Sequence, residues 1–203
     1  MSQRIGIFSG VFDPVHTGHI SFALESADKA KLDEVYFLIE SQPRRKQDVT
    51  HQAHRLAMLK LALASHTKLK TLEMPDKQMS VAKTLPRLKQ RFSNSKLVYL
   101  AGADMLEHMP DWPLIDRMLE QMDLVIGTKG LITTVQAKDL LKKFSMQPSE
   151  IIIFKSPRPS ISSKNIRQAL LSGKTAAGLP TSVQKYIKQH WLYAAPSGSA
   201  SSI

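Results

Sequence analysis

Two histidines three residues apart, His16 and His19, follow a short apolar strand-like run near the N-terminus. The turn that carries them begins at Gly10, contains Gly18 and opens onto an amphipathic pattern. A strand, a glycine-bearing turn and a helix N-terminus together form a common phosphate-binding arrangement in α/β proteins. Imidazole groups at this place can donate hydrogen bonds to phosphate oxygens, and Gly18 lets a ligand approach the backbone closely. The pattern predicts a site for a phosphorylated ligand.

This turn matches neither of two well-known glycine-rich phosphate-binding patterns. It lacks the G-x-G-x-x-G spacing of dinucleotide-binding proteins, and no Gly-Lys-Ser/Thr follows the strand. The one Gly-Lys-Thr in the chain, residues 173–175, follows a predicted helix and has Gln168 where the pattern needs its first glycine. The histidines therefore indicate a different nucleotide-binding architecture.

A second group of chemically useful residues, Ser162, Ser163 and Arg167, follows the last strand-like run. The two serines open a predicted helix, so their hydroxyls and backbone N–H groups can face an anion. Arg167 lies one helical turn further along and can reach the same anion. Each residue alone is more often a helix cap or a surface residue. Their occurrence together with the two histidines favours a binding site.

The composition fits one globular domain. The chain has 203 residues and 42% hydrophobic residues, enough for a sizeable core. It contains no cysteine, which excludes disulfides and thiolate zinc sites. No apolar run reaches the ~18 residues of a membrane span, and no signal-peptide pattern precedes the first strand. We therefore expect a cytoplasmic protein that makes no membrane contact.

The formal net charge of +11 suits a polyanionic ligand such as a nucleoside triphosphate. Nucleic acid is an unlikely partner, since aromatic residues make up only 6% of the chain and do not alternate with basic ones. The basic residues are spread along predicted helices, as at Lys138, Lys142 and Lys143. The sequence leaves the oligomeric state open, and a homo-oligomer is compatible with it.

Strand-like runs alternate with helical patterns along the chain. The predicted strands are Arg4–Ser9, Glu34–Ile39, Leu69–Glu73, Lys96–Ala101, Leu124–Gly127 and Ile151–Phe154. The predicted helices are Gly18–Lys31, His51–Ser65, Val81–Phe92, Pro113–Met122, Thr134–Phe144, Ser163–Leu171 and Thr181–His190. The alternation predicts an α/β fold with a doubly wound, mostly parallel sheet, in a single domain over residues 1–194. Residues 195–203 are predicted to form a flexible C-terminal tail.

Two details of the helices carry expectations of their own. Pro86 fits its predicted helix only if the helix begins close to it. In the helix over residues 51–65, Leu56, Leu59 and Leu63 form an apolar face, and Arg55 is expected to lie off that face.

The topology brings three segments to one edge. In an open parallel sheet, ligands bind at the carboxyl ends of the strands, where the strand order reverses. The first strand delivers the histidine turn there. The strand over residues 96–101 delivers Gly102 and Asp104 if it is the first strand's neighbour, and the last strand delivers residues 156–163. Such a crevice suits a two-substrate transferase.

These motifs resemble those of a known superfamily. The run Phe12–His19 resembles the HxGH signature of the nucleotidyltransferases that share their nucleotide-binding fold with class I aminoacyl-tRNA synthetases. The segment Ser156–Arg167 resembles the superfamily's second signature, ISSTxIR. The resemblance implies a Rossmann-like fold and transfer of a nucleotidyl group with release of pyrophosphate. It implies catalytic roles for His16, His19 and Arg167.

Further stretches resemble bacterial nicotinate mononucleotide adenylyltransferases over nearly the whole chain. They are Pro43–Lys46, His54–Leu59, Leu100–Leu106, Trp112 and the ending Val183–Tyr193. This resemblance implies transfer of AMP from ATP to nicotinate mononucleotide, in NAD biosynthesis. Mg²⁺ would accompany ATP and be held mostly by phosphates and water, without a protein metal site.

The resemblance also implies binding residues. Lys46 would contact the triphosphate, Asp104 the adenosine ribose, and Trp112 would stack on the pyridine ring. The full ATP-binding set is Gly10, Phe12, Gly18, Lys46, Gly102, Asp104, Ile161, Ser162 and Ser163. The acceptor-binding set is Asp13, Thr84 and Trp112.

Departures from the family pattern gather on the acceptor side. The family's Ser-Tyr-Thr-x-Asp-Thr-Leu segment is represented by residues 79–85, which keep Thr84 but carry Lys83 in place of the acid. Arg45 replaces a histidine, Thr128-Lys129-Gly130 replaces Arg-Pro-Gly, and Lys164 replaces a threonine. Two alternatives therefore remain open: a different phosphorylated acceptor, or a weakened nucleotide-binding regulatory homologue. Phosphopantetheine adenylyltransferases and cytidylyltransferases match the two signatures less well.

Overall fold

A single six-stranded sheet, with every pair of neighbouring strands parallel, forms the centre of the computed structural model, which describes residues 2–42, 48–129 and 132–194. The predicted triphosphate residue Lys46 and the predicted tail over residues 195–203 lie outside these ranges. The strands are β1 (Gln3–Gly10), β2 (Glu34–Ile39), β3 (Leu69–Leu72), β4 (Ser95–Gly102), β5 (Met122–Thr128) and β6 (Ile151–Lys155).

The strand order is β3-β2-β1-β4-β5-β6. The chain runs outward from β1 through β2 to β3, then returns to pair β4 with the other side of β1. The order therefore reverses between β1 and β4, which fulfils the condition under which Gly102 and Asp104 reach the histidine turn. This reversal marks the place where open parallel sheets bind ligands.

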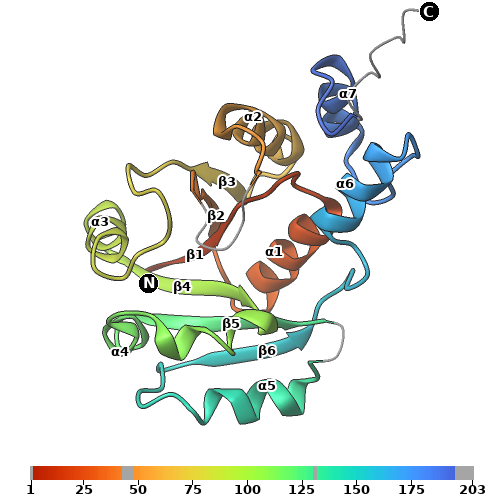
Figure 1. The fold of residues 1–203 in the computed structure, drawn as a ribbon. Coiled ribbons are helices and arrows are strands. Elements are labelled where there is room, and N and C mark those ends of the chain that lie inside the picture. The colour runs from red at the N-terminus through yellow and green to blue at the C-terminus, as the bar shows by residue number, and fades with distance from the viewer. Residues whose placement is uncertain (1, 43–47, 130–131, 195–203) are drawn as a thin grey trace, which may run out of the picture.

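Helices cover both faces of the sheet (Figure 1). The helices are α1 (Thr17–Lys29), α2 (Gln52–Leu63), α3 (Thr84–Arg91), α4 (Ile115–Leu119), α5 (Thr134–Leu141), α6 (Ser163–Leu171) and α7 (Thr181–Gln189), with short 3-10 turns η1 (Ala103–Met105) and η2 (Met109–Asp111). One buried cluster joins the sheet to α1, α2, α6 and α7, and a second joins it to α3, α4 and α5. The predicted doubly wound fold is confirmed.

The strands extend somewhat beyond most of their predicted bounds, and the helices are mostly shorter. The fourth predicted helix shrinks to α4, because Leu114 takes a left-handed φ of 63° before it and Met122 already belongs to β5. Helix α3 begins at Thr84, which places Pro86 in its first turn, where its missing N–H breaks no intrahelical bond. Every helix in the described part of the chain is too short or too polar to span a bilayer.

One expectation about α2 is wrong. Arg55 is fully buried, with 0% of its surface exposed, whereas the sequence analysis placed it off the apolar face. The buried face of α2 also includes Met58, Leu59 and Leu63. Arg55 precedes Leu59 by four residues, so it shares the leucine stripe by helical geometry. The reason for its burial lies in the loops above the sheet, described below.

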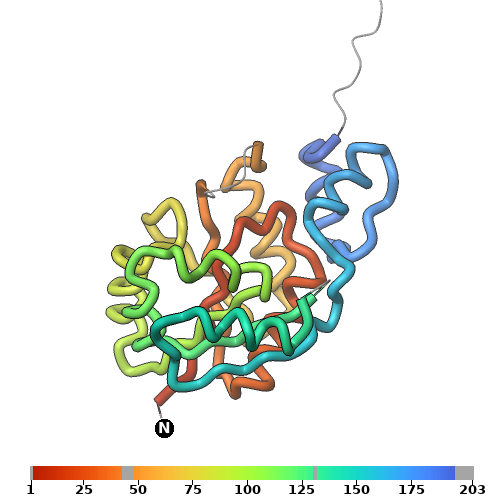
Figure 2. Tube along the Cα trace, turned by 60° about the horizontal axis from the view of Figure 1, so that its bottom comes forward, coloured from red at the N-terminus to blue at the C-terminus, as the bar shows by residue number. Residues whose placement is uncertain are grey.

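The C-terminal helices α6 and α7 lie together beside α1 and α2 (Figure 2). Val183 and Ile187 of α7 are buried in the same cluster as Met58 and Leu59 of α2. The second half of the chain thereby returns to the elements that flank β1, and this return brings the two predicted signatures together.

Candidate active site

A cavity of about 670 Å³ opens at the carboxyl ends of the central strands. Its walls come from the residues after β1, the residues after β4, Lys129 after β5, and the segment that joins β6 to α6. The three segments that the sequence predicted to converge do so. Eleven of the predicted site residues line this cavity: Gly10, Phe12, His16, Gly18, His19, Gly102, Asp104, Ile161, Ser162, Ser163 and Arg167.

His16 and His19 contact each other at the start of α1 through stacked rings and reciprocal hydrogen bonds. Their rings stack with centroids 3.6 Å apart and planes inclined by 18°. The backbone N–H of His19 donates to Nδ1 of His16, and the backbone N–H of His16 donates to Nδ1 of His19, each at 3.3 Å. This reciprocal capping satisfies backbone donors at the helix end and fixes the orientation of both rings.

The same hydrogen bonds decide which ring atom holds the proton. Because each Nδ1 accepts a hydrogen bond, a neutral ring at His16 or His19 carries its proton on Nε2. Burial, assisted by the positive charge of Lys129, lowers the pKa of His16 to about 4. His16 is therefore neutral near pH 7 and presents an Nε2–H donor.

Two neighbours hold the histidine rings in place. A Cβ added to Gly18 would lie 2.9 Å from Nδ1 of His16, so any side chain at that position would displace the ring. Phe12 adopts a left-handed φ of 52°, and its ring meets His19 edge to face at a centroid distance of 5.2 Å. Gly18 thus leaves space for the His16 ring, and Phe12 packs against the His19 ring.

The second signature is attached to the first by hydrogen bonds. Ser162 is the N-cap of α6, and its Oγ accepts from the backbone N–H of Asn165 at 3.2 Å. The hydroxyl of Ser163 donates to the carbonyl of Pro14 at 3.0 Å. Arg167 donates through Nη1 to the carbonyl of Asp13 at 2.6 Å. The N-terminus of α6, where backbone N–H groups attract anions, therefore faces the cavity that contains the histidines.

The predicted ribose residue lies at the mouth of the cavity. Asp104 follows β4 and is exposed, with Lys129 Nζ 3.9 Å from its carboxylate. A Cβ at Gly102 would overlap the Asp104 carboxylate, which explains the small residue there. The carboxylate is positioned to accept hydrogen bonds from a ligand's hydroxyl groups.

Asp13, predicted for the acceptor, does not line the cavity. Its side chain is buried, and its two carboxylate oxygens accept from the Tyr193 hydroxyl at 2.5 Å and the Thr50 backbone N–H at 3.3 Å. Its carboxylate therefore connects the turn after β1 to the residues just before α2 and just after α7.

Thr84 and Trp112, also predicted for the acceptor, do not line the cavity. Thr84 is fully buried at the start of α3, and Trp112 packs against the second buried cluster. The Thr84 hydroxyl donates to Asp76 and accepts from the backbone N–H of Ser80, both at 3.0 Å. The Trp112 ring meets Tyr99 edge to face at a centroid distance of 6.1 Å. The structure thus groups the predicted catalytic and ATP residues that it describes around one cavity, and the three predicted acceptor residues do not line that cavity.

Arg55 is a residue of the site's framework that the sequence analysis missed. Its guanidinium donates to four backbone carbonyls, those of Val11, Glu40, Ser41 and Thr50, at 2.7–3.1 Å. It thereby joins the loop after β1 to both ends of the loop after β2. Burial lowers the pKa of Arg55, and the negative charge of Asp13 opposes that shift. The sequence signal that could have predicted the burial of Arg55 is its four-residue spacing from Leu59, which puts both residues on one face of α2.

Lys129 is a second residue without a role in the sequence analysis, which recorded it only as a departure from the family pattern. It lines the cavity, lies near Asp104, and is close enough to His16 to lower the pKa of that ring. The positive charge of Lys129 therefore acts both on the histidine pair and on the predicted ribose residue.

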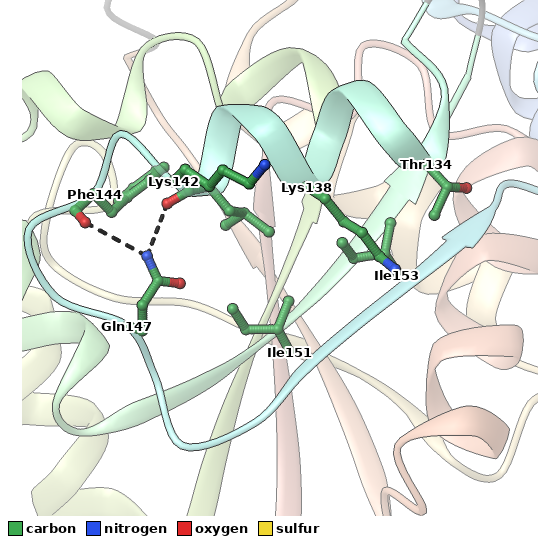
Figure 3. Close-up of a pocket in the computed structure, with 8 residues that line it drawn as sticks. Thr134, Lys138, Lys142, Phe144, Gln147, Ile151 and Ile153 are labelled. Carbon is green, nitrogen blue, oxygen red and sulfur yellow. Dashed lines mark hydrogen bonds between the residues drawn. The ribbon is translucent and has the colours of Figure 1, made fainter.

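Another cavity, of about 780 Å³, lies between α5 and the edge strand β6 (Figure 3). Lys138 of α5 and Lys142, which caps the end of that helix, lie above a floor that includes Ile151 and Ile153. Gln147 Nε2 donates to the carbonyls of Leu141 and Phe144. It contains none of the predicted site residues. The chemistry predicted from the sequence belongs to the cavity at the strand ends.

The cavity at the strand ends offers few ligands for a metal. Its acidic lining residues are Asp48 and Asp104. Among the described residues, no group of three or more His, Cys, Asp or Glu side chains is arranged to hold a metal ion. This donor set fits a cation that is held mainly by substrate phosphates and water.

Comparison with known structures supports the fold. Nicotinic acid mononucleotide adenylyltransferase of Plasmodium falciparum, solved in complexes with APC and with NaAD, superposes with a TM-score of 0.76 in both cases. The match covers 94% of this chain and 97% of the other, at 17% and 19% sequence identity.

Sequence comparison identifies closer relatives. The cytidylyltransferase-like family model matches residues 7–169. Nicotinate-nucleotide adenylyltransferase of Bacillus subtilis is 36% identical over 197 residues, which covers 94% of this chain and 98% of the relative. A probable nicotinate-nucleotide adenylyltransferase of Geobacillus kaustophilus is also 36% identical, over 96% of this chain and 88% of the relative. The chain therefore belongs to the cytidylyltransferase-like family and, by its relatives, to the nicotinate-nucleotide adenylyltransferases.

Proposed function

We propose that this enzyme transfers AMP from ATP to nicotinate mononucleotide and releases pyrophosphate. A phosphate oxygen of the mononucleotide attacks the α-phosphorus of ATP and forms a new P–O bond. The bond between the α-phosphorus and the oxygen that bridges it to the β-phosphate breaks, and pyrophosphate leaves. The product is nicotinate adenine dinucleotide, a dinucleotide of NAD biosynthesis.

The observation that carries this proposal is the pair of Nε2 donors beside the N-terminus of α6. The nucleophile is a phosphate oxygen that is already ionised near pH 7, so the site needs no general base. It needs donors for the negative charge that builds on the phosphate oxygens. His16 is neutral and, like His19, accepts at Nδ1, so both rings are arranged as donors and not as bases.

Different hydrogen-bond donors would bind different parts of ATP. The N-terminus of α6, with Ser162, Ser163 and Arg167, would bind the β- and γ-phosphates. The histidines would bind the α-phosphate oxygens, and Asp104 the ribose hydroxyls. Lys46 is proposed for the triphosphate from the family resemblance alone.

Mg²⁺ is the cation that we propose to accompany ATP. Asp48 and Asp104 are the carboxylates that border the cavity, and Lys129 neutralises part of the charge of Asp104. When bound, the ion would neutralise charge on the triphosphate. Because ATP is the donor, we also propose a cytoplasmic location.

The nicotinate identity of the acceptor rests on the relatives, and its contacts rest on the family resemblance. Trp112 follows the segment that runs from Gly102 through the cavity wall at Met105, so its ring is connected to the site by a short stretch of chain. We propose Trp112 and the start of α3 at Thr84 for the pyridine side. The carboxylate of Asp13 instead accepts a hydrogen bond from Tyr193.

Pyrophosphate release from ATP and Mg²⁺, measured in parallel with nicotinate mononucleotide and nicotinamide mononucleotide, tests this function. We expect release with the nicotinate form and much less with the amide. Release with another phosphorylated acceptor but neither pyridine nucleotide would replace the acceptor. Binding of ATP without release for any acceptor would support a regulatory homologue instead.

A further inference from the structure

The last described residues of the chain reach back to the first signature. Tyr193, which follows α7, donates its hydroxyl hydrogen to Oδ1 of Asp13 at 2.5 Å, across 180 positions of sequence. Asp13 lies three residues before His16 in the same turn. This hydrogen bond joins the end of the described chain to the histidine turn.

Four hydrogen bonds, this one included, join the turn to residues between positions 163 and 193. The bonds are Tyr193 Oη to Asp13 Oδ1, Arg167 Nη1 to the Asp13 carbonyl at 2.6 Å, Ser163 Oγ to the Pro14 carbonyl at 3.0 Å, and the Thr17 N–H to the Gly178 carbonyl at 2.8 Å. The C-terminal segment therefore forms hydrogen bonds with the backbone of the turn and with one of the turn's carboxylates.

Of the three bonds made by side-chain donors, the one from Tyr193 can be removed without changing a residue proposed to bind ATP. Asp13 is 4% exposed, and a buried carboxylate oxygen that loses its donor pays the full cost of desolvation. The other oxygen, Oδ2, accepts from the Thr50 N–H at a longer 3.3 Å. Burial, and then the hydrogen bond to Asp13, raise the pKa of Tyr193, so the hydroxyl stays protonated and remains a donor.

We propose that Tyr193 is a positioning residue for nucleotidyl transfer. Its hydroxyl fixes Asp13, and Asp13 fixes the turn that presents His16 and His19 to the transferred phosphate. Tyr193 acts through Asp13 and does not touch the substrates. The proposal rests on the proposed function, because its kinetic consequence requires that the histidines stabilise the reaction. A displacement of the order of 1 Å in such groups costs about 10²-fold in rate.

Tyr193→Phe is the test, and Tyr186→Phe is its matched control. Tyr186 lies in α7, and its hydroxyl pairs with Nδ1 of His54 at 3.0 Å on α2, away from the turn. Both variants remove one hydroxyl from the C-terminal segment. We expect Tyr193→Phe to lower kcat about 10-fold, with a smaller change in the KM for ATP, and we expect Tyr186→Phe to leave kcat within about twofold.

The ring ¹⁵N signals of His16 and His19 give a readout that does not depend on turnover. We expect Tyr193→Phe to shift these signals and Tyr186→Phe to leave them in place. A purely structural role for Tyr193 would lower the unfolding midpoint but leave both kcat of the folded enzyme and the histidine signals unchanged. That result would overturn the proposal.

Asp13→Ala provides a second route if Tyr193→Phe does not fold, and it should lower kcat and shift the histidine signals in the same way. Where both single variants fold, each removes the same bond, so the double variant should lose little more activity than the more damaged single variant. Fully additive losses in kcat would contradict the proposal. Absence of pyrophosphate release in the wild-type enzyme would instead refute the proposed function, and the histidine signals would still test the link between Tyr193 and the turn.

Discussion

His16 and His19 exchange hydrogen bonds, each backbone N–H donating to the other's Nδ1 at 3.3 Å, while their rings stack 3.6 Å apart. This exchange caps the start of α1 with its own side chains and places the ring proton of each neutral histidine on Nε2. The same two side chains therefore complete the local fold and prepare the site. Most of the behaviour that we expect of the enzyme follows from this pair and from the residues that hold it.

Replacing His19 with alanine should lower kcat by roughly 10²-fold or more, because it removes a donor to the charge that develops in the transition state. The cost to folding should be small, since His19 is only partly buried and its removal leaves α1 packed in the core. Steady-state kinetics beside a urea unfolding curve measure both effects. Unchanged turnover in the folded variant would remove His19 from the mechanism.

The depressed pKa of His16 should make stability depend on pH. The folded-state pKa is about 4 against 6.5 for the unconstrained ring, so the unfolded chain binds more protons between these values. The free energy of unfolding should therefore decrease as the pH falls from about 6.5 towards 4, with a contribution from His16 of about 2 kcal/mol between pH 7 and pH 5. In His16→Asn, which keeps a helix-capping side chain, this part of the slope should disappear. An identical slope in the variant would contradict the assignment.

Lys129→Met should raise the pKa of His16, because it removes a nearby positive charge that disfavours the imidazolium form. The pKa should stay below 6.5, since burial is the larger cause of the shift. An NMR titration of the His16 ring measures it. Lys138→Met, on α5 and outside the cavity at the strand ends, is the control and should leave the titration unchanged. A fall in the His16 pKa in Lys129→Met would contradict the electrostatic account.

Arg55→Leu should destabilise the fold by at least about 3 kcal/mol, because four buried or partly buried carbonyls lose a charged donor at once. Lys60→Met on the same helix is the comparison. Lys60 is exposed and forms an ion pair with Glu73 at 3.6 Å, so its loss should cost less than about 1 kcal/mol. Chemical denaturation separates the two, and similar costs would show that Arg55 does not organise the loops.

Trp112→Ala should raise the KM for the acceptor more than the KM for ATP. The expected reason is loss of the indole surface that we propose for the pyridine ring. Initial rates with each substrate varied in turn provide the comparison. Equal effects on the two KM values would place Trp112 in the supporting packing beside Tyr99, where the structure shows an edge-to-face contact.

The local pattern of the sequence was enough to predict the strands, their alternation with helices, and the meeting of the two signatures at one edge. Apolar runs and turn residues encode these features within a few positions. The pairing of β1 with β4 was only a condition for that meeting, and it is the structure that establishes it. The cavity at the strand ends accordingly holds every described residue predicted for catalysis or ATP.

What the sequence did not reveal depends on contacts between distant residues. Arg55 was expected off the apolar face of its helix, although it precedes Leu59 by four residues. Its burial depends on backbone carbonyls of three other loop segments, which the pattern of its own helix does not contain. The bond between Tyr193 and Asp13 spans 180 positions and leaves no periodic trace. Thr84 looked like a ligand contact, and in the structure its hydroxyl joins Asp76 and Ser80 at the start of α3.

The most direct test of the central claim follows the transferred phosphorus. ATP labelled with ³²P at the α position is incubated with Mg²⁺, nicotinate mononucleotide and the enzyme, and the products are separated. The account predicts that the label moves into nicotinate adenine dinucleotide while unlabelled pyrophosphate appears in equal amount. Label that remains in ATP, or that appears only in free AMP, would contradict the assignment of the histidine cavity to adenylyl transfer.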